Sequence, residues 1–163
     1  MKRKDHMKRI IGAIALILTA AMLFCACGQS AAKPLSEIFG SIKAEYSVTD
    51  MVEFDDVSTL ERFYGITEDQ VDEFAGGVNN SGVKMEEIVL VKAKDSAAAS
   101  DIAEKLNNRL SSKLNETKNY NPEQYAIVEK SSVDTDNLYV SLIISENVEG
   151  MKKLYKEGIG AAE

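Results

Sequence analysis

The 163-residue sequence predicts an α+β domain, a two-layer sandwich in which a mostly antiparallel four-stranded sheet carries helices packed mainly on one face. Strand-like patterns occur in two pairs, residues 72–79 with 87–94 and residues 125–133 with 138–145. Turn-forming residues join the members of each pair, which predicts two antiparallel hairpins. A long amphipathic segment, residues 95–120, separates the pairs, so we expect a helix to join the two hairpins.

The first folded segment, residues 35–46, has apolar residues at helical spacing and is predicted to be an amphipathic helix against the body of the domain. These apolar residues are Leu35, Ile38, Phe39, Ile42 and Tyr46. Residues 48–57 are less regular, because Val52 and Phe54 alternate with acidic residues. This segment is expected to form either a short edge strand or a packed loop.

Two helix-capping signals follow. Ser58 and Glu61 have the spacing of a capping box, in which a hydroxyl and a carboxylate satisfy the free backbone amides of a helix start. A short helix is expected there, and Gly65 is suited to end it. Thr67 and Gln70 repeat the same capping spacing directly afterwards.

After residue 70 the local signals conflict. The second capping signal favours a helix, whereas Gly76 and Gly77 would each weaken a helix by roughly 1 kcal/mol relative to alanine. Phe74, Gly76 and Val78 share one face of an extended chain, so a strand over residues 72–79 is predicted. The glycine pair is interpreted as a bulge or a tightly packed site, with addition of a partner's strand as the alternative.

Residues 87–94 show the clearest strand pattern, since they are apolar on both faces and therefore suit a central strand. This pattern also indicates that residues 35–46 partly cover the second face of the sheet. The long helix that follows has an apolar stripe for the first face. The stripe consists of Ala99, Ile102, Ala103, Leu106, Leu110 and Leu114.

The second hairpin is expected to turn at residues 134–137, which read Asp-Thr-Asp-Asn. Ser145 is suited to cap a final helix, and Gly158 and Gly160 are suited to end it. The buried stripe of that helix is predicted to be Val148, Met151, Leu154 and Tyr155.

The amino-terminal residues predict export. Residues 2–9 contain five Lys/Arg and one Asp, and residues 10–24 are apolar except for Thr19. A positive segment, an apolar run of this length and small residues after it are typical of a signal peptide. An uncleaved anchor helix is the alternative, because residues 10–30 are uncharged and roughly 20 apolar residues can span a bilayer.

The apolar run leads into Leu23, Phe24, Cys25, Ala26 and Cys27, which resembles the lipobox of bacterial lipoproteins. The resemblance implies that Cys27 carries a diacylglyceryl group and that residues 1–26 are removed; bulky Phe24 makes Cys25 the poorer candidate. Residues 27–34 would then be a lipidated tether before a single domain, residues 35–163. Two acyl chains give stable anchoring, so we expect a protein held by its lipid on the extracytoplasmic face of the cell membrane.

Cleavage would leave 137 residues with a net charge of −11, because five Lys/Arg and one Asp are lost. So acidic a domain is not expected to bind nucleic acid. The only other cysteine and the only histidine, Cys25 and His6, would leave with the signal peptide. The mature domain is therefore expected to have no internal disulfide and no catalysis or metal site that relies on imidazole. No cofactor is predicted, and no metal site is predicted beyond the acidic clusters described next.

Two acidic clusters are candidate contacts for a cation or a ligand. Asp134 and Asp136 alternate like the start of a Ca²⁺ loop, but a hairpin turn is the favoured interpretation because the glycine and distal glutamate of such loops are missing. Glu53, Asp55 and Asp56 form the second cluster, which can be paired carboxylates or a solvated loop; the solvated loop is favoured.

Residues 63–66, 86–95 and 122–125, together with the lipobox and residues 137–140, resemble the Gram-positive lipoprotein family known as domain of unknown function 4358. The resemblance extends over about residues 35–155. Residues 76–80 depart from it, since bulkier residues are expected there. The family implies a location and a fold but supplies no catalytic residues.

The leading functional hypothesis is a non-enzymatic accessory or ligand-binding lipoprotein, with the membrane as one partner through its lipid and an envelope protein as a candidate second partner. The alternative is a carboxylate-dependent hydrolase of the cell envelope, which requires two acids facing one cleft. A solute-capture subunit is disfavoured, because 137 residues do not readily form two lobes and a hinge. The oligomeric state stays open.

Overall fold

The computed structural model describes residues 32–161, so the predicted signal peptide and lipidation site, Cys27 included, lie outside the described residues. Within this range, five strands form one antiparallel sheet in the order β1-β2-β3-β5-β4. The strands are β1 Met51–Glu53, β2 Val71–Asn79, β3 Glu87–Ala93, β4 Val133–Asp136 and β5 Tyr139–Ile144. The predicted α+β class and the hairpin of β2 with β3 are confirmed. The second hairpin is present as β4 and β5, but its first strand lies later than predicted. Strand β1, one of two interpretations of residues 48–57, makes the sheet five-stranded rather than four-stranded.

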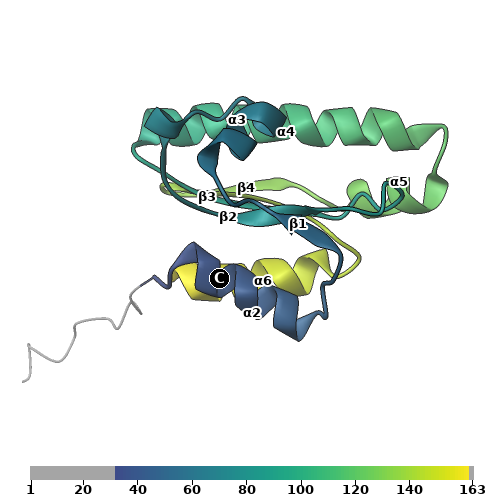
Figure 1. Ribbon diagram of the computed structural model, residues 1–163, viewed down its shortest axis with the longest axis horizontal. Helices are drawn as coiled ribbons and strands as arrows, with labels where there is room; N and C mark the ends of the chain where they lie inside the picture. Colours follow the sequence, from purple (N-terminus) through teal and green to yellow (C-terminus); the bar gives the residue numbers. More distant parts are fainter. Residues whose placement is uncertain (1–31, 162–163) are drawn as a thin grey trace, which may run out of the picture. The chain divides into compact units, whose positions relative to one another are not determined.

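Helices cover both faces of the sheet. The helices are α2 Leu35–Glu45, α3 Val57–Tyr64, α4 Ser96–Lys118, α5 Pro122–Val128 and α6 Val148–Ile159, with a short 3₁₀ turn η2 Glu68–Gln70. Figure 1 shows α2 and α6 on one side of the sheet and α3 and α4 on the other. The prediction of two layers with helices mainly on one face is therefore wrong, and the domain has three layers.

The central strand β3 explains the three layers. Ile88 and Leu90 face the core formed with α2 and α6, whereas Val89 and Val91 face the core formed with α4. All four side chains are fully buried. Because successive residues of a strand point to opposite faces, a strand that is apolar throughout needs a helical layer on each side. The predicted central position of this strand and the cover over its second face are thus confirmed.

The segment before β4 is a helix, so the prediction of a strand over residues 125–133 is wrong for most of its length. The Asn121 side chain accepts a hydrogen bond from the Gln124 backbone N–H, and Pro122 occupies the first turn of α5. A proline suits a first helical turn because its missing N–H would be unpaired there. The strand begins only at Val133, so Asp134 and Asp136 lie in β4, and the turn is formed by residues 137–138.

Two helix caps also differ from the expected ones. Asp56 caps α3 by accepting a hydrogen bond from the Ser58 backbone N–H, so Ser58 lies in the first turn and is not the cap. The final helix starts after Asn147, and Ser145 instead lies two residues before that position and accepts a hydrogen bond from the Asn147 N–H. The capping box of Thr67 and Gln70 is present, but it caps the 3₁₀ turn η2.

The glycine pair in β2 marks a site of close backbone approach, as the favoured interpretation predicted. Gly76 has φ +152°, and a Cβ there would lie 2.1 Å from the Ile88 carbonyl oxygen. A Cβ on Gly77 would lie 2.7 Å from the carbonyl oxygen of Val52 in β1. Because β1 pairs with this end of β2, the strand edge at Gly77 is already occupied.

We expect Gly76→Ala to lower the free energy of unfolding by at least about 3 kcal/mol, because the methyl group would collide with backbone and the φ value disfavours side chains. Gly40→Ala is the matched control: a Cβ there meets no atom within 4 Å. Inside α2 this change should raise stability by about 0.5–1 kcal/mol. Urea denaturation followed by circular dichroism measures both, and equal stability of Gly76→Ala and wild type would contradict the contact.

Candidate functional site

The five acidic residues proposed as cation or ligand contacts do not form one site. Glu53 lies in β1 and Asp134 and Asp136 lie in β4, which are the two opposite edge strands of the sheet. Asp55 and Asp56 are exposed in the connection from β1 to α3. The two predicted clusters are therefore separated by the width of the sheet.

Three of these acids have structural partners. Glu53 forms an ion pair with Lys43 of α2, and the Asp134 carboxylate lies 2.9 Å from the Nζ of Lys152 in α6. The hydrogen bond from the Ser58 backbone N–H lowers the pKa of Asp56, as its capping role requires. Over residues 32–161, no group of three or more His, Cys, Asp or Glu residues is placed to hold a metal ion.

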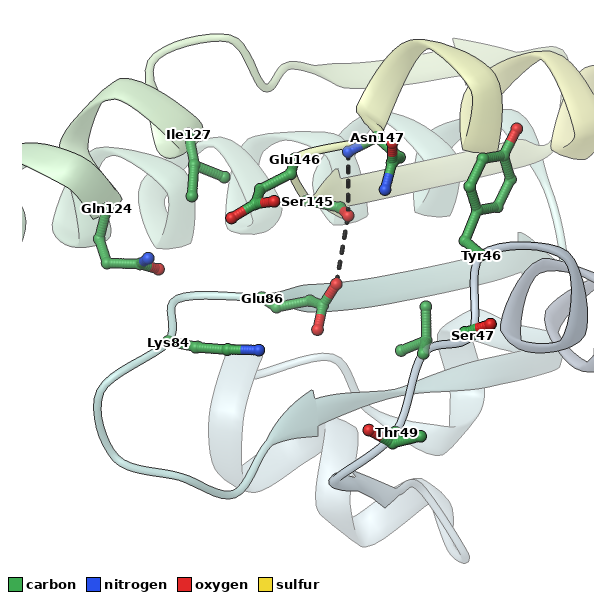
Figure 2. A pocket seen from close by; sticks show the side chains of 11 residues that line it. Tyr46, Ser47, Thr49, Lys84, Glu86, Gln124, Ile127, Ser145, Glu146 and Asn147 are labelled. Atoms are coloured by element: carbon green, nitrogen blue, oxygen red, sulfur yellow. Dashed lines mark hydrogen bonds between the residues drawn. The ribbon is translucent and has the colours of Figure 1, made fainter.

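A polar pocket of about 180 Å³ lies at one end of the sheet (Figure 2). Its walls come from four parts of the chain: the loop after α2, the loop before β3, helix α5, and the connection from β5 to α6. The lining consists of residues 46–49, Lys84, Glu86, Gln124, Ile127 and residues 145–147.

The pocket begins where the side chains on one face of β3 and β5 change from apolar to polar at the ends of these strands. In β3, Leu90 and Ile88 face α2 and α6, and Glu86 comes two residues before Ile88 in the same direction. In β5, Ile143 faces the same core, and Ser145 comes two residues later. The pairing of Glu87 with Ile144 brings these strand ends together.

Hydrogen bonds fix the floor of the pocket. The Ser145 hydroxyl donates to Glu86 Oε1 at 3.2 Å and accepts from the Asn147 N–H at 3.3 Å, as Figure 2 shows. The Gln124 side-chain oxygen accepts from the Met85 N–H at 2.7 Å, which ties α5 to the segment before β3. Ser145 is buried, so this chain of bonds holds the Glu86 carboxylate at a defined position.

The loop after α2 closes one side of the pocket. Ser47 has φ +49°, a left-handed conformation that is uncommon for residues other than glycine. Tyr46 lies against the first turn of α6, since a Cβ on Gly150 would be 2.2 Å from the tyrosine hydroxyl. This wall is therefore held against α6 by direct contact.

The neighbouring residue, Glu87, faces the opposite core and is neutralised there. Its carboxylate accepts from Arg109 Nε at 3.1 Å and Nη2 at 2.8 Å, and Lys113 Nζ lies 2.9 Å from the same carboxylate. Burial by itself would raise the pKa of Glu87, but the Arg109 hydrogen bonds and the charges of Lys113 and Arg109 outweigh burial and hold the pKa below its usual range.

Tyr64 of α3 completes this buried ionic cluster of Glu87, Arg109 and Lys113. The Arg109 guanidinium lies 5.8 Å from the centre of the Tyr64 ring. Burial raises the pKa of Tyr64, and the nearby negative charge of Glu87 raises it further. The tyrosine therefore stays neutral, and the cluster joins α3 and α4 to the sheet.

We expect Glu87→Gln to lower the free energy of unfolding by about 3 kcal/mol at pH 7, because the buried Lys113 and the partly exposed Arg109 would lose their counter-charge. Glu104→Gln, an exposed change on the same helix as Arg109, should alter it by less than about 0.5 kcal/mol. Urea denaturation measures both variants.

The pH dependence separates a charge effect from a packing effect. A carboxylate with a lowered pKa in the folded state contributes stability above its unfolded pKa, about 4.3, and loses it as the pH falls through the folded pKa. The difference between wild type and Glu87→Gln should therefore shrink below about pH 4. A difference that stays constant between pH 7 and pH 3 would contradict the ionic role.

The residues of the pocket were not among those predicted from the sequence as site residues. Glu86 and Ser145 are 59 positions apart, and only the pairing of β3 with β5 brings them together. The one available signal was the interruption of two apolar alternating patterns by a polar residue at the strand end. Such an interruption also occurs wherever a strand simply reaches solvent, so it does not identify a pocket.

Comparisons with known proteins give one positive result. Neither the curated proteins nor the solved structures contain a match to the chain. No helix within residues 32–161 is long and apolar enough to cross a membrane. A family match covers residues 44–145, which include all five strands and most of the pocket lining. This match covers more than half of the chain, so the protein belongs to the family described as domain of unknown function 4358.

Proposed function

We propose that this protein is a lipid-anchored, extracytoplasmic accessory protein that binds a partner through the polar pocket. The observation that supports this proposal is the placement of the pocket relative to the start of the folded domain. The chain enters the domain at one end of the layer formed by α2 and α6, and the pocket lies at the other end.

The backbone gives the geometry of this arrangement. The Lys33 N–H donates to the Gly158 carbonyl at 2.9 Å, so the chain enters the domain beside the carboxyl end of α6. Helix α2 has 11 residues, which correspond to about 16 Å. Its far end leads into Tyr46, which contacts Gly150 at the amino end of α6 and lines the pocket.

The tether would limit how far the domain can move from the membrane. Lys33 comes six positions after Cys27, and a fully extended chain over six positions spans at most about 21 Å. An anchor that precedes Lys33 in the sequence would attach to the domain at a point separate from the pocket, so the pocket would stay available to a partner in the extracytoplasmic space. Glu86, Glu146 and Lys84 would supply charged groups for that contact.

One observation favours the alternative, a carboxylate-dependent envelope hydrolase: Glu86 and Glu146 both line the same pocket. Binding is nevertheless the better-supported proposal, because 180 Å³ is below the roughly 300–1,000 Å³ of pockets that enclose drug-sized ligands. A glycan strand would need more room. Release of sugars from purified peptidoglycan by wild type, but not by Glu146→Gln, would favour the hydrolase instead.

We expect Cys27→Ala to abolish lipid attachment. The protein should then either leave the membrane fraction or keep its signal peptide and migrate differently on a gel. A single thioether-linked diacylglyceryl group provides two acyl chains, and their loss removes the anchoring free energy of about 0.8 kcal/mol per buried methylene. Membrane fractionation and gel mobility measure the change, with Cys25→Ala as the matched control. Unchanged retention and mobility of Cys27→Ala would contradict the anchor.

A photo-crosslinking amino acid tests the role of the pocket. Placed at Asn147, which is exposed at the pocket, it should give a discrete covalent adduct when the full chain is present in membranes. Placed at the exposed Glu104 of α4, it should not give that adduct. Identical adduct patterns from the two positions would contradict a binding role for the pocket.

A further inference from the structure

We propose that the pocket receives one positively charged side chain, a lysine or an arginine, from a protein partner. This inference rests on the proposed function and specifies the chemistry of the partner. Four features support it: the charge of the lining, the size of the pocket, the few apolar side chains in its otherwise polar lining, and the exposed residues on neighbouring loops.

The charge of the lining favours a cation. Glu86 and Glu146 contribute two carboxylates, and Lys84 contributes one ammonium group. Glu86 bonds to the Ser145 hydroxyl, and over residues 32–161 no Lys or Arg forms an ion pair with it. The adjacent Glu87 shows the contrast, because Arg109 and Lys113 neutralise it within the domain. A cation in the pocket would give Glu86 the counter-charge that Glu87 already has.

The size of the pocket favours a single side chain over a whole small molecule. Its volume of about 180 Å³ lies below the range of pockets that enclose drug-sized ligands. Tyr46, Val48 and Ile127 supply apolar surface beside the carboxylates. Lysine and arginine match this combination, since their methylene stems lie along apolar surface while the charged head seeks a polar partner.

Exposed residues on two adjoining loops favour a polypeptide as the source of the cation. Val83 immediately precedes the lining residue Lys84 and is 64% exposed. Tyr120 is 89% exposed in the turn that leads to α5, the helix that supplies Gln124 and Ile127. Tyrosine is enriched at protein interfaces, where its ring contributes contact area. The net charge of the domain, −11 without the signal peptide, would also attract a basic partner.

The test uses the full lipidated chain in detergent micelles and defined probes. The main probe is a pentapeptide with a central lysine, blocked at both ends so that lysine carries its only charge; its counterpart has norleucine in place of lysine. Wild type should bind the lysine peptide about tenfold more tightly than the norleucine peptide, as expected for one charged hydrogen bond. Amide chemical shifts near Glu86 and Ser145 report the binding site.

Matched variants give the decisive comparison. Glu86→Gln keeps an acceptor for the Ser145 hydroxyl but removes the charge. It should therefore lower the affinity for the lysine peptide about tenfold and leave the affinity for the norleucine peptide unchanged. Glu104→Gln should change neither affinity, and thermal melting checks that both variants fold.

Three outcomes would overturn the inference: equal affinity for the two peptides, no binding of the lysine peptide at millimolar concentration, or equal affinity for the lysine peptide and n-butylamine. The last outcome would assign the pocket to a free amine. None of these three results would remove an adduct formed from position 147, so failure of this inference is distinguishable from failure of the proposed partner-binding role.

Discussion

The central strand β3 imposes the constraint on which the rest of the domain depends. Its residues are buried on both faces, so the sheet requires a helical layer on each side. The strand also starts with a charged residue, Glu87, that is fully buried. An unpaired carboxylate would be too costly there, so α4 must present two cations at that point. Arg109 and Lys113 are four residues apart and therefore lie on the same face of α4.

Two adjacent acidic residues therefore have different roles, because successive side chains of a strand point to opposite faces of the sheet. Glu87 faces α4, and its charge is satisfied internally by Arg109 and Lys113. Glu86, one residue earlier, is directed to the other side, where the core of α2 and α6 ends and Ser145 is its hydrogen-bond partner. The register of β3 with β5 thus fixes the fold and the pocket together. A slip of one residue would exchange the two carboxylates and leave a buried charge without a cation.

Most of the fold could be predicted from periodic patterns, and the errors occurred where the same residues are compatible with two different local structures. Apolar alternation located β3, and helical spacing located α2 and α4. The predicted long helix ends at residue 120, directly before Asn121 and Pro122. This pair caps and starts α5, whereas the apolar residues that follow it were predicted to form a strand. The pocket could not be predicted, because its walls meet only through pairings between distant segments, and no local pattern records which strands become neighbours.

The layer of α2 and α6 links the start of the domain to the pocket as one rigid element. The helices approach closely at Gly158, where a Cβ would lie 2.7 Å from the Ile38 side chain, and again at Gly150 beside Tyr46. Contacts at both ends of α2 prevent it from sliding along α6, because each glycine accepts one specific side chain of its neighbour. The distance between Lys33 and the pocket is therefore set by packing and not by a flexible linker. Packing of α2 against α6, beside the family-matched sheet, thus holds the pocket at a fixed distance from the point where the chain enters the domain.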